Sequence, residues 1–214
     1  YEWRSFVDSY VLGHGTNGHR RHMSFVPVPS VGTVHADGSI RRVMILEPQD
    51  SEECVSNLQS KLSPSVLYGL VESHGEGRKS EPLCFITEAR DRGVWDYYLP
   101  PQKKALWHSV TPVILHGFNS LRGKFSLKKT EELLYQAFEE SGYPRSSITE
   151  LCFQPAPFWA GTQGALAMRV PEHLAKWPRY HVSVRFHQPI KGPLVIGIGR
   201  HYGIGLFAAP QTGA

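Results

Sequence analysis

The alternation of apolar and polar positions is clearest in the second half of the chain. Residues 180–188 alternate strictly, which predicts a strand with one buried face. Apolar runs at 107–115 and 147–154 predict two more strands. The apolar members of the alternating strand are Tyr180, Val182, Val184 and Phe186, and the polar members are His181, Ser183, Arg185 and His187.

Residues 125–144 carry apolar positions at helical spacing, with an N-capping serine before them and a glycine after them. This pattern is typical of a helix that packs on a sheet. The residues concerned are Leu127, Leu134, Ala137 and Phe138 in the apolar stripe, Ser126 at the cap and Gly142 at the end.

The first half shows weaker periodicity. Strands are predicted at 23–28 and 39–46 on either side of a turn-rich segment, and an amphipathic helix is predicted at 51–62. Two further strands are predicted at 83–89 and 94–99. These elements fit a second, looser unit of the kind formed by the second half.

The order strand, helix, strand, strand, strand in the second half is that of a ferredoxin-like sheet whose second helix is degraded. We therefore expect an α+β fold with two tandem ferredoxin-like (RRM-like) subdomains, at 1–105 and 106–214, and a glycine-rich loop near the C-terminus.

The glycine-rich loop lies within residues 192–207. Gly197, Gly199, Gly203 and Gly205 surround the cationic pair Arg200 and His201. Because glycine tolerates positive φ and has no Cβ, such a run can aim backbone N–H groups at an anion while the arginine supplies charge. A dinucleotide-binding fingerprint is disfavoured, since that motif must open a helix within a βαβ unit. A glycine-kinked edge strand is the alternative interpretation.

Composition favours a polyanionic partner. The 214 residues are 41% hydrophobic, enough for a real core, and carry a net charge of +4. The 11 histidines are the usual residues for proton transfer near neutral pH. The 3 cysteines are odd in number and widely spaced, which argues against a disulfide framework. This cysteine usage fits a reducing cytoplasm. Neither a membrane span nor a signal peptide is predicted.

Three ordered blocks of sequence point to a family. GIGRHYGIGLF resembles the glycine-rich loop of the RAMP superfamily of CRISPR-associated proteins, which are ferredoxin-like RNA binders. The blocks HMSFVPVPSVGTVHADGSIRRVMI, WHSVTPVIL and RFHQPIKGPLVIGIGRHYGIGLF together are similar to the C-terminal half of the Geobacter-type fusion protein of type I-U (I-G) CRISPR systems. In that family a backbone subunit is joined to a repeat-processing endoribonuclease.

The resemblance implies a metal-independent nuclease, without cofactor, that cuts CRISPR repeat RNA and retains the 3′ handle of the product. The implied partners are the crRNA and other subunits of a type I effector complex. Because the chain begins at Tyr1 rather than Met, a fused backbone domain before it is an expectation of the same resemblance.

Cleavage by the RNA's own 2′-hydroxyl requires a base, an acid and cations near the phosphate, and leaves a cyclic phosphate. Because enzymes of this family commonly use a histidine of the first ferredoxin-like unit, His22 and His35 are the candidates for base and acid. The alternative for both is a structural role at a turn or strand end. Candidate RNA-binding residues are Arg20, Arg21, Arg200, His201, the four loop glycines and the lysines near the predicted helix start, Lys124, Lys128 and Lys129.

Two other functions are weighed against the nuclease. A noncatalytic RNA-binding subunit would keep the basic surface without an activated histidine. A metal-dependent hydrolase would use His14, His19 and His22 with Asp37. We expect no metal site, because the adjacent arginines Arg20 and Arg21 repel a divalent cation and no cysteine lies nearby.

Overall fold

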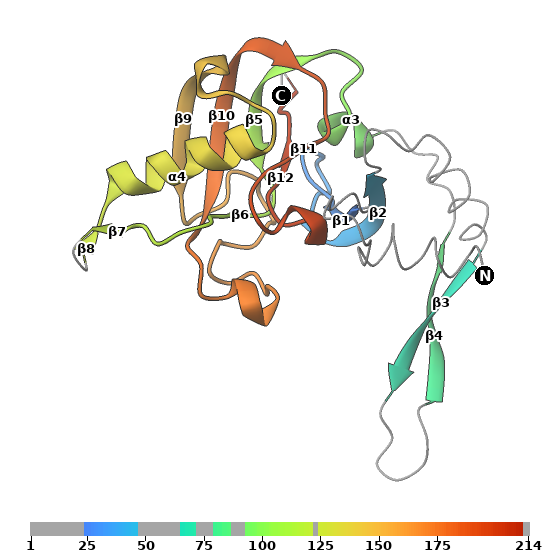
Figure 1. Cartoon of the computed structure of the whole chain (residues 1–214). Coiled ribbons are helices and arrows are strands. Elements are labelled where there is room, and N and C mark those ends of the chain that lie inside the picture. Colours follow the sequence, from blue (N-terminus) through green and yellow to red (C-terminus); the bar gives the residue numbers. More distant parts are fainter. Residues whose placement is uncertain (1–23, 47–64, 72–78, 87–92, 122–123, 212–214) are drawn as a thin grey trace, which may run out of the picture. The chain divides into compact units, whose positions relative to one another are not determined.

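The computed structural model describes residues 24–46, 65–71, 79–86, 93–121 and 124–211 (Figure 1). The chain divides into two compact units. The described part of the first unit is an antiparallel hairpin of β3 (Ser65–Val71) and β4 (Lys79–Ile86). All other described elements belong to the second unit.

The second unit is built on an antiparallel sheet in which β12, β5, β10 and β9 are neighbours in that order. Along the chain these are the fourth, first, third and second strands, which is the strand order of a ferredoxin-like unit. Short strands β11 and β6 extend the sheet beside β12 and β10. The bounds are β5 (Lys104–Ser109), β6 (Val113–Ile114), β9 (Ile148–Gln154), β10 (Arg179–Ile190), β11 (Leu194–Val195) and β12 (Leu206–Ala208).

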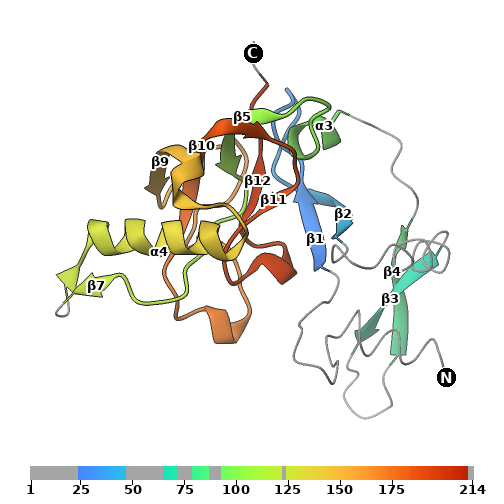
Figure 2. The same cartoon turned by 45° about the horizontal axis from the view of Figure 1, so that its top comes forward.

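Helix α4 (Leu127–Glu140) covers one face of this sheet (Figures 1 and 2). Ser126 caps it by accepting a hydrogen bond from the Lys129 N–H (3.2 Å), and Gly142 follows it at φ +87°, as predicted. The prediction for Leu127 is wrong: its side chain is 65% exposed, because the buried stripe begins at Thr130. The apolar core between helix and sheet includes Leu133, Leu134, Ala137, Phe138, Trp107, Val182, Val184, Phe186 and Phe207.

Strands β1 (Ser24–Pro29) and β2 (Ile40–Leu46) form an antiparallel hairpin (Figure 2). Its residues Val26, Val28 and Met44 pack against Leu206 and Ala208 of β12, whose side chains alternate with that of Phe207 in the first core. This second apolar cluster explains why two segments far apart in sequence form one unit. The boundary predicted at residues 105 and 106 falls within β5. The α+β class is confirmed, and the tandem arrangement of two ferredoxin-like subdomains stays a prediction.

The strand predicted at 94–99 is wrong, because Trp95–Tyr98 form the helical turn α3. Consecutive side chains of a strand point to opposite faces, whereas this turn lets two neighbouring tyrosines reach one loop. The Tyr97 and Tyr98 hydroxyls donate to the carbonyls of Gly32 (2.6 Å) and Pro29 (2.7 Å).

The strand predicted at 107–115 is interrupted between β5 and β6, and the helix predicted at 51–62 lies outside the described residues. The remaining short elements are β7 (Ser120–Leu121), β8 (Lys124–Phe125), η2 (Arg145–Ser147), η3 (Glu172–Leu174) and η4 (Arg200–Tyr202).

Candidate functional site

The glycine-rich segment 196–205 joins β11 to β12 and contains η4. Gly203 (φ +70°) and Gly205 (φ +89°) adopt the left-handed conformation that favours glycine. A Cβ on Gly203 would collide with Pro27 of β1, and one on Gly205 would collide with the carbonyl oxygen of Ile196. These two glycines therefore allow the segment to pack against β1 and to fold back on β11.

Many backbone donors of this segment are used inside the protein. The Thr111 hydroxyl accepts hydrogen bonds from the N–H groups of Gly205 and Leu206 (both 2.9 Å) and donates to the Gly203 carbonyl (3.0 Å). The Ile198 N–H donates to the carbonyl of Ile114 (3.2 Å). The expectation that the loop aims its N–H groups at an anion is therefore not supported at these positions. An anion bound at η4 would be held by the side chain of Arg200 instead.

Arg200 and His201 line an open pocket of about 210 Å³. A hydrogen bond of 2.9 Å joins the Ser24 hydroxyl to His201 Nδ1 and so ties the start of β1 to η4. These two residues are 177 positions apart in the sequence. The pocket lining comprises Ser24, Leu46, Ser141, Tyr143, Pro193, Val195, Arg200 and His201.

Among the described residues that line the pocket, the Arg200 guanidinium carries a full positive charge, and Ser24, Ser141 and Tyr143 contribute hydroxyl groups. Burial raises the pKa of Tyr143, so its phenol stays protonated and able to donate a hydrogen bond. The pocket lies at the C-terminal end of α4, where the helix dipole carries a partial negative charge. The full charge of the Arg200 guanidinium exceeds that partial charge, so the arrangement can hold a phosphate by charge-assisted hydrogen bonds.

The sequence candidates in the first half are only partly described. Arg20, Arg21 and His22 lie outside the described residues, with His22 two positions before Ser24 in the chain. His35 is exposed in the turn at the far end of β1, a strand of 6 residues and therefore about 17 Å long.

Two charged residues beside His35 pair with each other. Arg41 donates two hydrogen bonds of 2.8 Å to the Asp37 carboxylate, and this pairing holds the pKa of Asp37 well below its usual range. The metal set proposed for Asp37 with His14, His19 and His22 includes three residues outside the described part of the chain.

The predicted lysine group lies at the opposite end of α4 from the pocket. Lys124 is in β8, and Lys128 and Lys129 are in the first turn of α4 (Figure 1). A helix of 14 residues is about 20 Å long, so the structure does not bring these lysines to Arg200. Lys129 forms a 3.7 Å ion pair with Glu132, and Lys124 and Lys128 are exposed.

Two histidines that the sequence analysis did not select are held in the sheet. His181 is fully buried, with hydrogen bonds to the Gln163 carbonyl (2.9 Å) and the Ser109 hydroxyl (3.2 Å). Burial lowers its pKa and favours the neutral ring, which suits a structural role. Its place on the polar side of the alternating strand was the only sequence signal, and that signal predicted exposure rather than burial.

His108 stacks on Phe158 at 5.2 Å, and the Trp159 indole donates to its carbonyl (3.2 Å). Burial first, and then the charge of Arg185, lower the pKa of His108. Arg185 itself pairs with Glu150 at 2.9 Å. Phe158 and Trp159 thus cover the His108 ring on this part of the sheet.

The described part of the chain holds no group of three or more histidine, cysteine, aspartate or glutamate residues arranged to bind a metal ion. Within the same residues, no helix has the length and apolar character needed to cross a membrane.

Comparison with known protein families identifies a match over nearly the whole chain. The model of a protein family, described as CRISPR-associated protein, GSU0054 family, matches residues 3–210 and therefore nearly the whole chain. No curated protein and no solved structure matches the chain.

Proposed function

Because this chain belongs to the GSU0054 family of CRISPR-associated proteins, we propose that it is the endoribonuclease that cleaves CRISPR repeat RNA. The observation that carries the proposal is the hydrogen bond between Ser24 and His201 in an open pocket that also holds Arg200. A histidine fixed beside an arginine provides the two things that this reaction needs, proton transfer and stabilisation of phosphate charge.

In the proposed reaction, a histidine removes the proton from a ribose 2′-hydroxyl, and the resulting oxygen attacks the adjacent phosphorus. The bond from phosphorus to the 5′-oxygen breaks, and a second group protonates that oxygen. The products are a 2′,3′-cyclic phosphate and a free 5′-hydroxyl. Arg200 binds the phosphate oxygens as charge builds up on them, and no metal takes part.

We assign the proton transfers to His201 and to the sequence candidates His22 and His35. His201 is favoured over His35, because Ser24 holds His201 in the pocket whereas His35 lies beyond the far end of β1. His22 lies outside the described residues and stays a candidate from the sequence. Arg20 and Arg21 are proposed to add charge for the phosphate. The loop glycines are proposed to shape the RNA-binding surface through their backbone.

The proposal includes the remaining features implied by the resemblance. The chain would be a RAMP protein of the cytoplasm, corresponding to the C-terminal half of a fusion with a backbone subunit. After cleavage it would keep the 3′ handle of the crRNA and act together with the other subunits of a type I effector complex.

The test is to incubate the full chain with its cognate repeat RNA in EDTA and to identify the ends of the products. We expect cleavage at one position with cyclic phosphate ends. Intact but bound RNA would instead support a noncatalytic subunit of the effector complex. Cleavage that EDTA abolishes would contradict the metal-independent reaction.

A further inference from the structure

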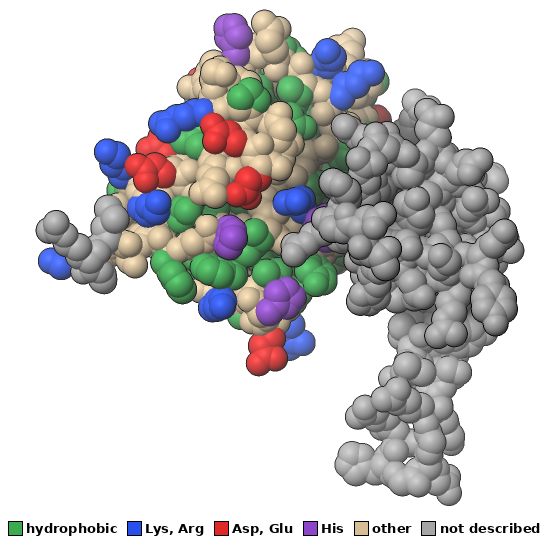
Figure 3. All heavy atoms as spheres, in the orientation of Figure 1, with side chains coloured by type: hydrophobic (Ala, Val, Ile, Leu, Met, Phe, Trp, Pro, Cys, Tyr) green, Lys and Arg blue, Asp and Glu red, His purple; other side chains and the backbone are tan. Residues whose placement is uncertain are grey.

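A group of partly exposed aromatic and cationic side chains lies outside the pocket described above. The Phe118 side chain is 61% exposed, and its ring centroid is 5.1 Å from that of Trp177. The His116 ring meets Trp177 edge-on at 5.6 Å, and Lys176 Nζ lies 5.0 Å from the centre of the same indole. We call His116, Phe118, Lys176 and Trp177 the aromatic patch. Hydrophobic and histidine side chains lie next to lysine and arginine along the lower part of the coloured surface in Figure 3.

The aromatic patch is held in place from beneath. Trp177 packs against the buried side chains of Ile114, Leu174 and Ile204. Because Trp177 is anchored in this way, the exposed ring of Phe118 rests on a fixed neighbour. A fixed aromatic surface loses little conformational entropy when a planar ligand stacks on it.

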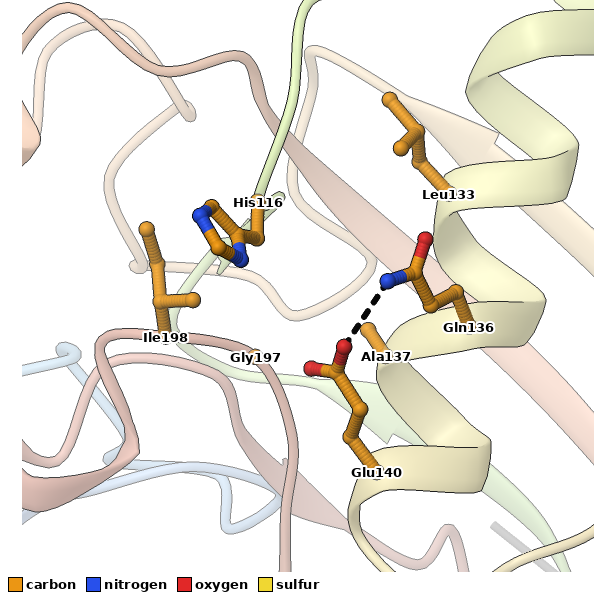
Figure 4. A pocket seen from close by; sticks show the side chains of 7 residues that line it. All are labelled: His116, Leu133, Gln136, Ala137, Glu140, Gly197 and Ile198. Carbon is orange, nitrogen blue, oxygen red and sulfur yellow. Dashed lines mark hydrogen bonds between the residues drawn. The ribbon is translucent and has the colours of Figure 1, made fainter.

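Hydrogen-bonding groups lie beside the patch. His116 lines a shallow hollow together with Gln136 and Glu140 of α4, and Figure 4 shows these three side chains directed toward the same space. The Gln136 amide donates to the Glu140 carboxylate (2.9 Å), which orients both groups. The hollow has no accessible volume of its own, so these polar groups form part of the surface around the patch rather than a pocket for a base. Ile198, which also lines the hollow, precedes Arg200 by two residues.

We propose that the aromatic patch binds unpaired bases of RNA that extend from the cleaved repeat. This inference rests on the proposed function, since it takes RNA as the ligand. Aromatic faces accept any base by stacking, and adjacent cations attract the phosphates between the bases. A protein partner is less well matched, because the Lys176 ammonium group interrupts the apolar surface with a positive charge directly beside Trp177.

The test compares two RNAs in which 2′-O-methyl groups prevent cleavage, a stem-loop of the cognate repeat with and without a single-stranded tail of about eight adenosines. Affinity is measured by fluorescence anisotropy with the full chain. The tail should raise the affinity of the wild-type protein at least about fivefold, and Phe118→Ala should remove most of that gain. Phe118 is the residue of choice because an exposed side chain contributes little to folding stability, and a melting curve of the variant verifies this.

Phe125→Ala is the matched control. Phe125 is a phenylalanine of similar exposure (58%), in β8 beside the first turn of α4, and its replacement should leave the gain from the tail unchanged. A Phe118→Ala protein that keeps the full gain overturns the aromatic patch as an RNA site. The same follows if Phe118→Ala weakens binding of another effector subunit but not of the tail. If neither RNA binds the wild-type protein, the proposed function itself fails, and the patch fails with it.

Discussion

The two ends of helix α4 carry the same kind of charge but differ in how that charge is held. At the N-terminal end, Lys124 and Lys128 are exposed and Lys129 pairs with Glu132. At the C-terminal end, Arg200 and His201 belong to a helical turn that is bonded to β1 and lines a pocket. Of these two basic groups, Arg200 and His201 line a defined pocket, whereas the described lysines at the other end lie on the open surface.

The difference lies in the backbone around each charge. Gly203 and the Thr111 hydroxyl fix the path of the chain just after η4, and the hydrogen bond from the Ile198 N–H to the Ile114 carbonyl fixes it just before, so the arginine is presented from a fixed position. A positioned cation loses less side-chain entropy when it binds a phosphate than a lysine on a helix surface does. We therefore expect the C-terminal end to determine activity and the N-terminal end to contribute only general attraction.

The largest effect on stability is expected from a change in the backbone beside η4, at the end of α4 where the pocket lies. Gly203→Ala should lower the free energy of unfolding by about 3 kcal/mol or more, because a left-handed alanine is strained and its Cβ would collide with Pro27. Gly142→Ala is the control: Gly142 also has positive φ (+87°), yet open space surrounds the site of its Cβ. It should cost only about 1 to 2 kcal/mol.

Urea unfolding of both variants measures this difference. If both variants lose the same free energy of unfolding, the contact with Pro27 does not constrain Gly203. In that case η4 is not held in a fixed position against β1.

The second effect concerns the chemistry. His201→Ala should slow single-turnover cleavage of repeat RNA by about a hundredfold or more while affinity changes little, because a group that transfers a proton acts in the transition state. His22→Ala should act in the same way. His35→Ala is predicted by the sequence to do so too, whereas the distance along β1 favours a smaller effect.

Rates at saturating protein decide between these residues, and equilibrium binding of uncleavable RNA provides the control. A wild-type rate for His201→Ala would mean that the pocket is not the catalytic site, and wild-type rates for all three variants would mean that other residues carry out the proton transfers.

Local periodicity was sufficient to predict α4, because the cap, the buried stripe and the terminal glycine lie within one segment and act through short-range geometry. The strict alternation in β10 predicted its buried face for the same reason. Turn α3 was mispredicted because its conformation depends on hydrogen bonds from Tyr97 and Tyr98 to a loop more than 60 residues away.

The site was harder to predict than the fold. Arg200 and His201 were selected from the glycine pattern around them, but Ser24 and Tyr143 had no local signal, since only long-range packing brings them to the pocket. The separation of the lysines from Arg200 follows from the direction in which α4 crosses the sheet. Sequence spacing alone does not contain that direction.

The third effect tests the phosphate contact. Arg200→Ala should weaken binding of repeat RNA by about 1 to 3 kcal/mol and leave the melting temperature almost unchanged, because the side chain is partly exposed and no glycine geometry is altered. Arg185→Ala removes an equal charge from a residue that pairs with Glu150, and it should change affinity much less. Normal binding by the Arg200→Ala protein would leave the glycine segment as no more than a kinked connection between two strands.

The smallest effect is expected at the lysine end of α4. Each of Lys124→Ala and Lys128→Ala should weaken RNA binding by only about threefold at moderate salt, since an exposed lysine contributes through general attraction that salt screens. Each replacement that removes one phosphate contact should also reduce the slope of log affinity against log salt by about one, without altering the cleavage rate at saturation. Titrations of uncleavable repeat RNA at several salt concentrations measure both quantities.

If Lys128→Ala weakened binding as much as Arg200→Ala and also slowed cleavage, the two ends of the helix would be equivalent. Affinity of the wild-type protein that does not fall as salt rises would contradict the electrostatic contribution at both ends, because counterion release accompanies every phosphate contact.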